Sequence, residues 1–137
     1  MNRIASLAAA AVVAVFGVGT VAEAAAVQPS GVWRNPKNSV HVKVQPCGTN
    51  VCGTVVWANA RAKEKARKAG TPDLVGRQLF QDLRPAGGGS WNGRVFVPDM
   101  GRSFSGSLKP AGPNNMVAQG CLLGRYICKT QTWTRVG

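Results

Sequence analysis

The chain has 137 residues, and its 17 lysines and arginines against 5 carboxylates give it a net charge of +12. This length suits one domain with one hydrophobic core, which argues against a multidomain protein. The excess of positive charge indicates attraction to anionic surfaces, but it carries no information about the fold.

The N-terminus has the features of a secretory signal peptide. Arg3 supplies a short positive start, residues 4–18 are an apolar run, and residues 22–24 form a small-x-small cleavage pattern. A membrane anchor would need roughly 20 apolar residues, which is more than this run offers. We therefore expect a signal peptide at residues 1–24 and one mature domain at residues 25–137. That domain would be periplasmic or secreted and not transmembrane after processing.

Three strands are expected at the start of the mature domain. Residues 30–33 predict a short first strand. Valines alternate with polar residues over residues 39–45, which predicts a second strand with one buried face. The β-branched stretch at residues 51–58 predicts the third strand.

The composition then changes to alanine, lysine and arginine, which favour a helix over residues 60–69. Asn59 can cap the N-terminus of this helix, and Gly70 can end it. Its five bases, which outnumber a single glutamate, are Arg61, Lys63, Lys65, Arg67 and Lys68. The segment could be a lid over a barrel mouth or a docking patch for an anionic surface. A solvated charged loop that only adds solubility is the other reading, because an isolated helix of this length is marginal.

Strands resume at residues 77–83, 91–97 and 102–109, between turns rich in glycine and proline. Three serines occupy alternate positions of the last stretch, so we expect their hydroxyls on one face of a sheet.

A long hairpin closes the chain. The Gly124-Arg125 pair is typical of a two-residue hairpin turn. Counting outward from it places Leu122 opposite Ile127 and Cys121 opposite Cys128, so the turn chemistry and the cysteine spacing give the same register.

The last strand ends at Arg135 and needs a sheet to close onto, and we expect it to pair with the first strand at residues 31–33. The pattern as a whole predicts an all-β domain of about eight antiparallel strands, with one short helix between the third and fourth. A meander of this kind removes its own open edges by closing as a barrel.

Four cysteines allow three disulfide connectivities. Cys47 and Cys52 flank one hairpin turn, and Cys121 and Cys128 flank another, so we expect local pairs. A zinc site fits poorly, because ligand cysteines are usually closer together than the second pair. No metal or cofactor is expected.

Several stretches together resemble a known family. They are Gly31-Val32-Trp33, the sequence CGTVVW at residues 52–57, WNGRVFVP at 91–98, Gly101-Arg102, and the hairpin from Gly120-Cys121 to residues 133–135. Over nearly all of residues 30–135 the chain resembles the bacterial Domain of Unknown Function 2147 family. The resemblance implies an exported lipocalin-like barrel with no established enzymatic activity. It also implies that Arg135 stacks on Trp33 of a Gly31-x-Trp33 motif, as a structural unit at the closed end.

The chain carries little that points to catalysis. It has one histidine, and neither a paired-carboxylate motif nor a nucleophile elbow is present, so we expect no enzyme. Aromatic residues should mostly form the core. The candidates to line a pocket inside the barrel are Trp57, Trp91, Phe96 and Phe104. A barrel of eight strands has room for a filled core or for one small ligand.

Two functions remain open from the sequence. The first is an exported binding module for a small ligand that is partly apolar or anionic. The second is a structural, envelope-associated protein whose basic surface binds lipid headgroups, lipopolysaccharide or cell-wall polymers, with no internal ligand. Nucleic acid is not an expected partner, because an exported chain seldom meets it. An enclosed apolar pocket would favour the first function, and a filled interior would favour the second.

Overall fold

The computed structural model describes residues 11–14, 17, 29–122 and 127–137. Most of the expected signal peptide and the expected Gly124-Arg125 turn lie outside these residues, and both stay predictions. Within the described part of the chain, no helix has the length and apolar character that a membrane crossing requires.

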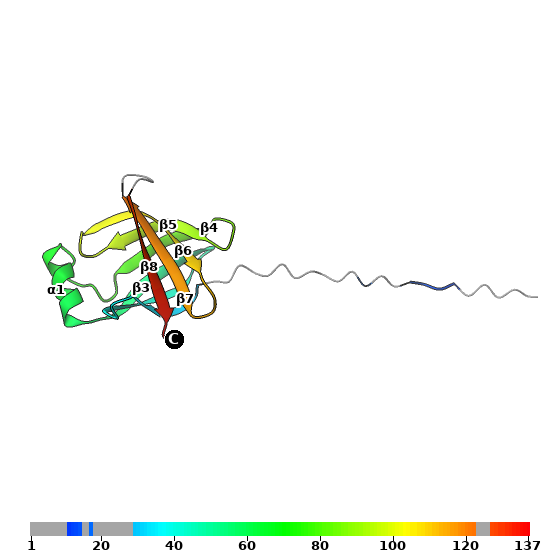
Figure 1. Cartoon of the computed structure of the whole chain (residues 1–137), viewed down its shortest axis with the longest axis horizontal. Helices are drawn as coiled ribbons and strands as arrows, with labels where there is room; N and C mark the ends of the chain where they lie inside the picture. The colour runs from blue at the N-terminus through cyan, green and yellow to red at the C-terminus, as the bar shows by residue number, and fades with distance from the viewer. Residues whose placement is uncertain (1–10, 15–16, 18–28, 123–126) are drawn as a thin grey trace, which may run out of the picture.

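The described residues form eight antiparallel strands and one helix, which Figure 1 shows wound into a barrel with α1 at one end. The elements are β1 (Gly31–Arg34), β2 (Val40–Cys47), β3 (Asn50–Ala58), α1 (Ala60–Lys68), β4 (Gln78–Pro85), β5 (Trp91–Val97), β6 (Arg102–Pro110), β7 (Asn115–Leu122) and β8 (Ile127–Arg135). Each strand pairs with the next, and β8 returns to β1, so the barrel is closed. The expected fold, with its single inserted helix, is confirmed.

The closing hairpin has the register that the sequence predicts. Cys121 pairs with Cys128, and Leu122 pairs with Ile127. The Cys121–Cys128 disulfide joins β7 to β8, and the Cys47–Cys52 disulfide joins β2 to β3. Both expected local pairs are therefore present, and their sulfurs form disulfides rather than a zinc site.

The barrel is closed by a very short ladder. The pairing of β1 with β8 consists of Trp33 with Arg135 and Arg34 with Thr134. By comparison, β7 and β8 pair along eight positions. Backbone hydrogen bonds extend this seam beyond the ladder, since the Val32 N–H donates to the Gly137 carbonyl at 2.9 Å and the Val136 N–H donates to the Val32 carbonyl at 2.8 Å.

Aromatic side chains meet in the barrel interior. Phe80 of β4 and Trp133 of β8 lie on strands that are four places apart in the closed order, which puts them on opposite walls. Their ring centroids are nevertheless 5.5 Å apart, in an edge-to-face arrangement at 72°. Phe80 also covers Gly53, where a Cβ atom would lie 2.5 Å from the Phe80 ring. Two walls whose side chains touch leave no ligand cavity between them at this level.

Helix α1 forms as the sequence predicts. The Asn59 side chain accepts a hydrogen bond from the Ala62 backbone N–H at 2.8 Å, which satisfies a free donor of the first turn. After the helix, Gly70 takes a left-handed conformation with φ of 94°. Ala66 is fully buried in the hydrophobic core, and Ala62 packs against that core. The apolar contact explains why this short helix is stable here although it would be marginal alone.

A filled interior makes a direct prediction for Phe80. Replacement by alanine should lower the free energy of unfolding by about 3–5 kcal/mol, because the cavity would lie between two packed walls. Chemical denaturation measures this change, and Phe104→Ala, which truncates a partly exposed ring, should cost less. A loss below about 1 kcal/mol for Phe80→Ala would show that the ring is not part of a packed core.

Candidate functional site

The barrel end at α1 is the most charged part of the described surface. The basic patch consists of Arg61, Lys63, Lys65, Arg67 and Lys68, all of which are exposed. Arg67 donates two hydrogen bonds to Glu64, at 2.6 and 3.0 Å, and Lys68 lies 3.9 Å from the same carboxylate. The side-chain hydrogen bond from Arg67, together with its positive charge, lowers the pKa of Glu64 below its ordinary value. One carboxylate thus faces five bases, and the patch stays strongly positive.

Four exposed apolar side chains lie in the segments that adjoin the same helix, while two others of similar exposure, Ile127 and Val136, lie at the two ends of β8. We call Val56, Trp57, Val75 and Met100 the apolar rim, and their exposed fractions lie between 42 and 47%. The first two directly precede α1 in the chain. The Gly76 N–H donates a hydrogen bond to the Val55 carbonyl, which holds the segment after Val75 against β3.

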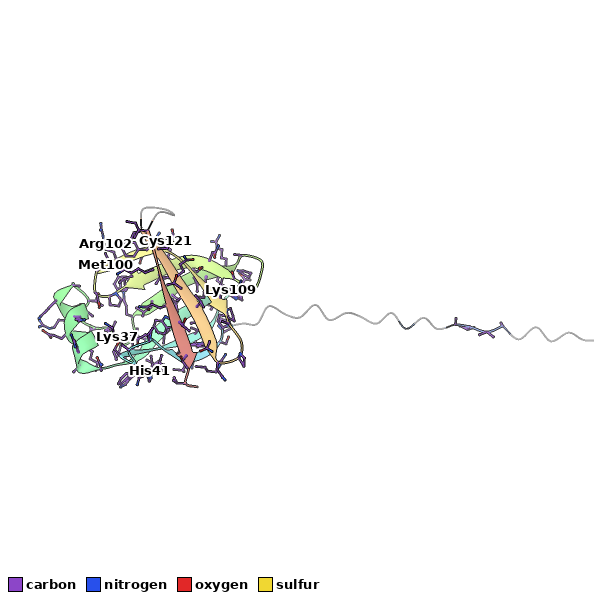
Figure 2. The ribbon with its side chains drawn as sticks, in the orientation of Figure 1. Lys37, His41, Met100, Arg102, Lys109 and Cys121 are labelled. Carbon is purple, nitrogen blue, oxygen red and sulfur yellow. A yellow bond between two sulfur atoms is a disulfide. The ribbon has the colours of Figure 1, made fainter. Side chains whose placement is uncertain are left out.

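Met100 reaches the helix from the β5–β6 turn. A Cβ atom on its neighbour Gly101 would lie 2.5 Å from the Ala69 carbonyl oxygen, so this turn touches the end of α1. Figure 2 shows Met100 and Arg102 on the side of the barrel where α1 lies, with Lys109 on the opposite side. The apolar rim and the basic patch therefore share one end of the molecule.

Trp57 does not line the interior, contrary to the sequence prediction. Strict alternation would put it on the inner face with Val55, but the register shifts at this point. Val42 pairs with Val55, whereas the adjacent His41 pairs with Trp57, so Val56 is an extra residue. This bulge turns the Trp57 side chain outward, where its ring lies 4.5 Å from that of His41.

Phe96 does not line the interior either, although the sequence predicted that it would. Trp91 and Phe104 lie on the inner face, since Trp91 pairs with the buried Leu108 and Phe104 pairs with Val95. Phe96 follows Val95 and points the other way. It is buried there because Arg77, after α1, lies with its guanidinium 4.1 Å from the Phe96 ring. Two of the four proposed lining residues are therefore inside the barrel.

The predicted stack of Arg135 on Trp33 is present at the β1–β8 seam. The Arg135 guanidinium lies 4.3 Å from the centre of the Trp33 ring. Arg135 also donates hydrogen bonds to the carbonyls of Ser30 at 2.7 Å and Pro113 at 2.8 Å. Gly31 leaves room for it, because a Cβ atom there would collide with Arg135 Nη1. These contacts are structural, and they reinforce the seam beside its backbone hydrogen bonds.

The apolar rim was not predicted from the sequence. The adjacent pair Val56-Trp57 breaks the alternation of β3, and that break was the one signal of a bulge. Val75 and Met100 lie in connections without periodicity, so only the packing of those connections shows their exposure.

Comparison with known proteins identifies a similar fold and a family for this barrel. A solved structure described as "Protein HP1028 from the human pathogen Helicobacter pylori belongs to the lipocalin family" is similar, with a TM-score of 0.61 and 16% identity. The match covers 79% of this chain and 82% of that one, and at this identity it shows a shared lipocalin-like fold. Residues 31–135 match the model of the family described as "Uncharacterized protein conserved in bacteria (DUF2147)". The chain belongs to that family. A search of the curated proteins found no match.

The seam predicts how a variant at Arg135 behaves. Arg135→Ala should lower the free energy of unfolding by about 1–3 kcal/mol, since it removes a cation–π contact and two hydrogen bonds. Arg94→Ala is the control, because Arg94 is exposed and should change stability by about 0.5 kcal/mol or less. Thermal and chemical unfolding would measure both variants. Equal stability of the Arg135 variant and the wild type would contradict the role of the stack.

Proposed function

We propose that this protein is an exported, envelope-associated barrel that docks on an anionic lipid surface through the end that carries α1. The observation that supports this most is the coincidence of the apolar rim with the basic patch at one end of the barrel. The role is one of binding rather than catalysis. Export is supported by the signal-peptide features and by two disulfides, which persist in oxidising compartments.

The two kinds of side chain supply different parts of the binding energy. A basic residue near an anionic membrane surface contributes about 1 kcal/mol. Three to five residues of the basic patch would therefore contribute about 3–5 kcal/mol, and less as salt screens them. Tryptophan favours the membrane–water interface, where its ring meets the acyl boundary and its N–H stays near water. Trp57 and its apolar neighbours would add a contribution that salt does not remove.

A small-ligand function inside the barrel is the second candidate, and the lipocalin-like fold is what supports it. Phe80 and Trp133 touch across the barrel, which fills part of the space that an internal ligand could occupy. Of the four aromatic residues expected around a pocket, Trp57 and Phe96 point elsewhere. The described residues present a basic outer surface, on which the docking proposal rests.

Vesicle sedimentation tests this function. Wild-type protein should bind vesicles containing phosphatidylglycerol and should bind phosphatidylcholine vesicles weakly. A variant with all five bases of the basic patch changed to Gln should bind the anionic vesicles at least about 100-fold more weakly, which corresponds to about 3 kcal/mol. Wild-type binding should also weaken at high salt, where the screening length falls to about 3 Å.

A matched variant controls for net charge. It changes five exposed bases of the barrel wall to Gln, namely Lys43, Arg84, Arg94, Lys109 and Lys129. This control should keep most of the vesicle binding, because its bases lie on strands of the barrel and not on α1. Equal losses in the two variants, or binding by the α1 variant equal to wild type, would contradict docking through this end. Binding to lipopolysaccharide or cell-wall polymer without binding to vesicles would assign the patch to a different anionic surface.

A further inference from the structure

A second surface lies on the outer wall of the barrel. Strands β4 to β7 form a groove with a volume of about 750 Å³. Its polar lining includes Arg84, Asn92, Arg94, Ser105, Ser107 and Gln119. A volume of this size is within the range of small-molecule sites, about 300–1,000 Å³.

The strand register shows that these side chains point outward. Trp91 and Val95 of β5 face the core, so Asn92 and Arg94, which alternate with them, face solvent. Asn92 pairs with Ser107, and Arg94 pairs with Ser105. Ser107 pairs in turn with Gln119 of β7. The polar residues thus form adjacent rows across neighbouring strands, and the three alternating serines of β6 belong to them.

Glycines set the shape of this wall. Gly93 pairs with Gly106, and Gly106 pairs with Gly120, so a row of glycines crosses β5, β6 and β7. A Cβ atom on Gly93 would lie 2.7 Å from the Gln81 carbonyl oxygen and 2.8 Å from that of Asp82. These glycines share the core-facing row with Trp91 and Val95, and a Cβ on Gly93 would also meet the buried Leu83 side chain, so this position lets β5 pack closely against β4 behind the groove. A Cβ on Gly120 would meet nothing within 4 Å.

The charged groups of the groove are available for a ligand. Among the described residues, neither Arg84 nor Arg94 forms an ion pair. Asp82 also lines the groove, and its carboxylate lies within 4.8 Å of the Cys47 and Cys52 sulfurs. Arg94 has one long hydrogen bond, 3.4 Å from Nη2 to the Ser103 carbonyl oxygen. Asp82 itself lies at a β-bulge with a left-handed φ of 47°, a conformation that non-glycine residues seldom adopt.

We propose that this groove binds an acidic sugar, that is, a hydroxyl-rich ring bearing a carboxylate. Arginine guanidinium groups recognise carboxylates through paired, charge-assisted hydrogen bonds. The amides of Asn92 and Gln119 and the hydroxyls of Ser105 and Ser107 both donate and accept, which suits sugar hydroxyls. The groove is lined by no aromatic or large aliphatic side chain, so the selectivity that we propose rests on these polar and charged groups.

The inference goes beyond docking through α1, since it concerns another face and another ligand. The probe is a trisaccharide of galacturonic acid, titrated into the full mature protein and followed by the backbone and side-chain amide signals in NMR spectra. Signals of Asn92, Gly93, Gly106 and Gln119 should shift together. Maltotriose, a neutral trisaccharide, should bind at least about tenfold more weakly.

Two variants test the assignment of the groove. The double variant R84Q/R94Q should bind the acidic trisaccharide at least about tenfold more weakly, whereas K37Q/K43Q, which loses the same charge elsewhere, should bind like wild type. Both variants alter exposed side chains, and unchanged NMR spectra outside the substituted positions would show that each is folded. Absence of binding by wild type, shifts confined to α1, or equal weakening in the two variants would overturn the proposal. Equally tight binding of inorganic phosphate would overturn the sugar class.

The affinity for galacturonic acid as a monosaccharide shows whether the ligand is a free sugar or a segment of a polymer. Both are forms of the proposed ligand. Affinity that increases from the monosaccharide to the trisaccharide supports a polymer that runs along the groove. Equal affinities support a single acidic ring between Arg84 and Arg94.

Discussion

The stack of Arg135 on Trp33 is the side-chain contact that reinforces the closure of the barrel, where β1 and β8 have two ladder pairs and Val32 adds backbone hydrogen bonds to Val136 and Gly137. One arginine ties together the first strand, the chain before it and the β6–β7 turn through two carbonyl hydrogen bonds. Trp33 in turn donates its indole N–H to the Pro29 carbonyl at 2.9 Å. A closed barrel holds its walls in register, and that register decides which side chains face the core and which face solvent.

Both binding surfaces that we propose lie on the outside of this lipocalin-like barrel. Phe80 and Trp133 meet inside the barrel. The polar groove lies on the outer wall, and the basic patch lies on α1 at one end. These two surfaces differ in kind. The end at α1 combines positive charge with exposed apolar side chains, which suits an interface between water and lipid. The outer groove combines positive charge with amides and hydroxyls, which suits a hydrated, anionic sugar.

The sequence predicted the features that local spacing controls. Alternation located the strands, the cysteine spacing gave the disulfides and the hairpin register, and capping by Asn59 marked the start of α1. The basic patch was also evident from the sequence. What failed was the direction of Trp57 and Phe96. A bulge at Val56 turns the Trp57 side chain from the inner face to the outer face. Phe96 points outward and is nevertheless buried, because Arg77 lies over its ring. The groove could not be predicted, because its rows of polar side chains form only when four strands pair in a particular register.

The fluorescence of Trp57 tests docking through α1 most directly. Trp33, Trp91 and Trp133 are buried, so Trp57 is the exposed tryptophan that a surface can reach. A lipid quencher, such as brominated acyl chains in phosphatidylglycerol vesicles, should quench its emission and shift it to the blue, and a Trp57→Phe variant should lose this response while keeping most of the salt-dependent binding. Emission of bound protein that stays unshifted and unquenched would show that another face meets the membrane, and it would contradict the orientation proposed for this protein.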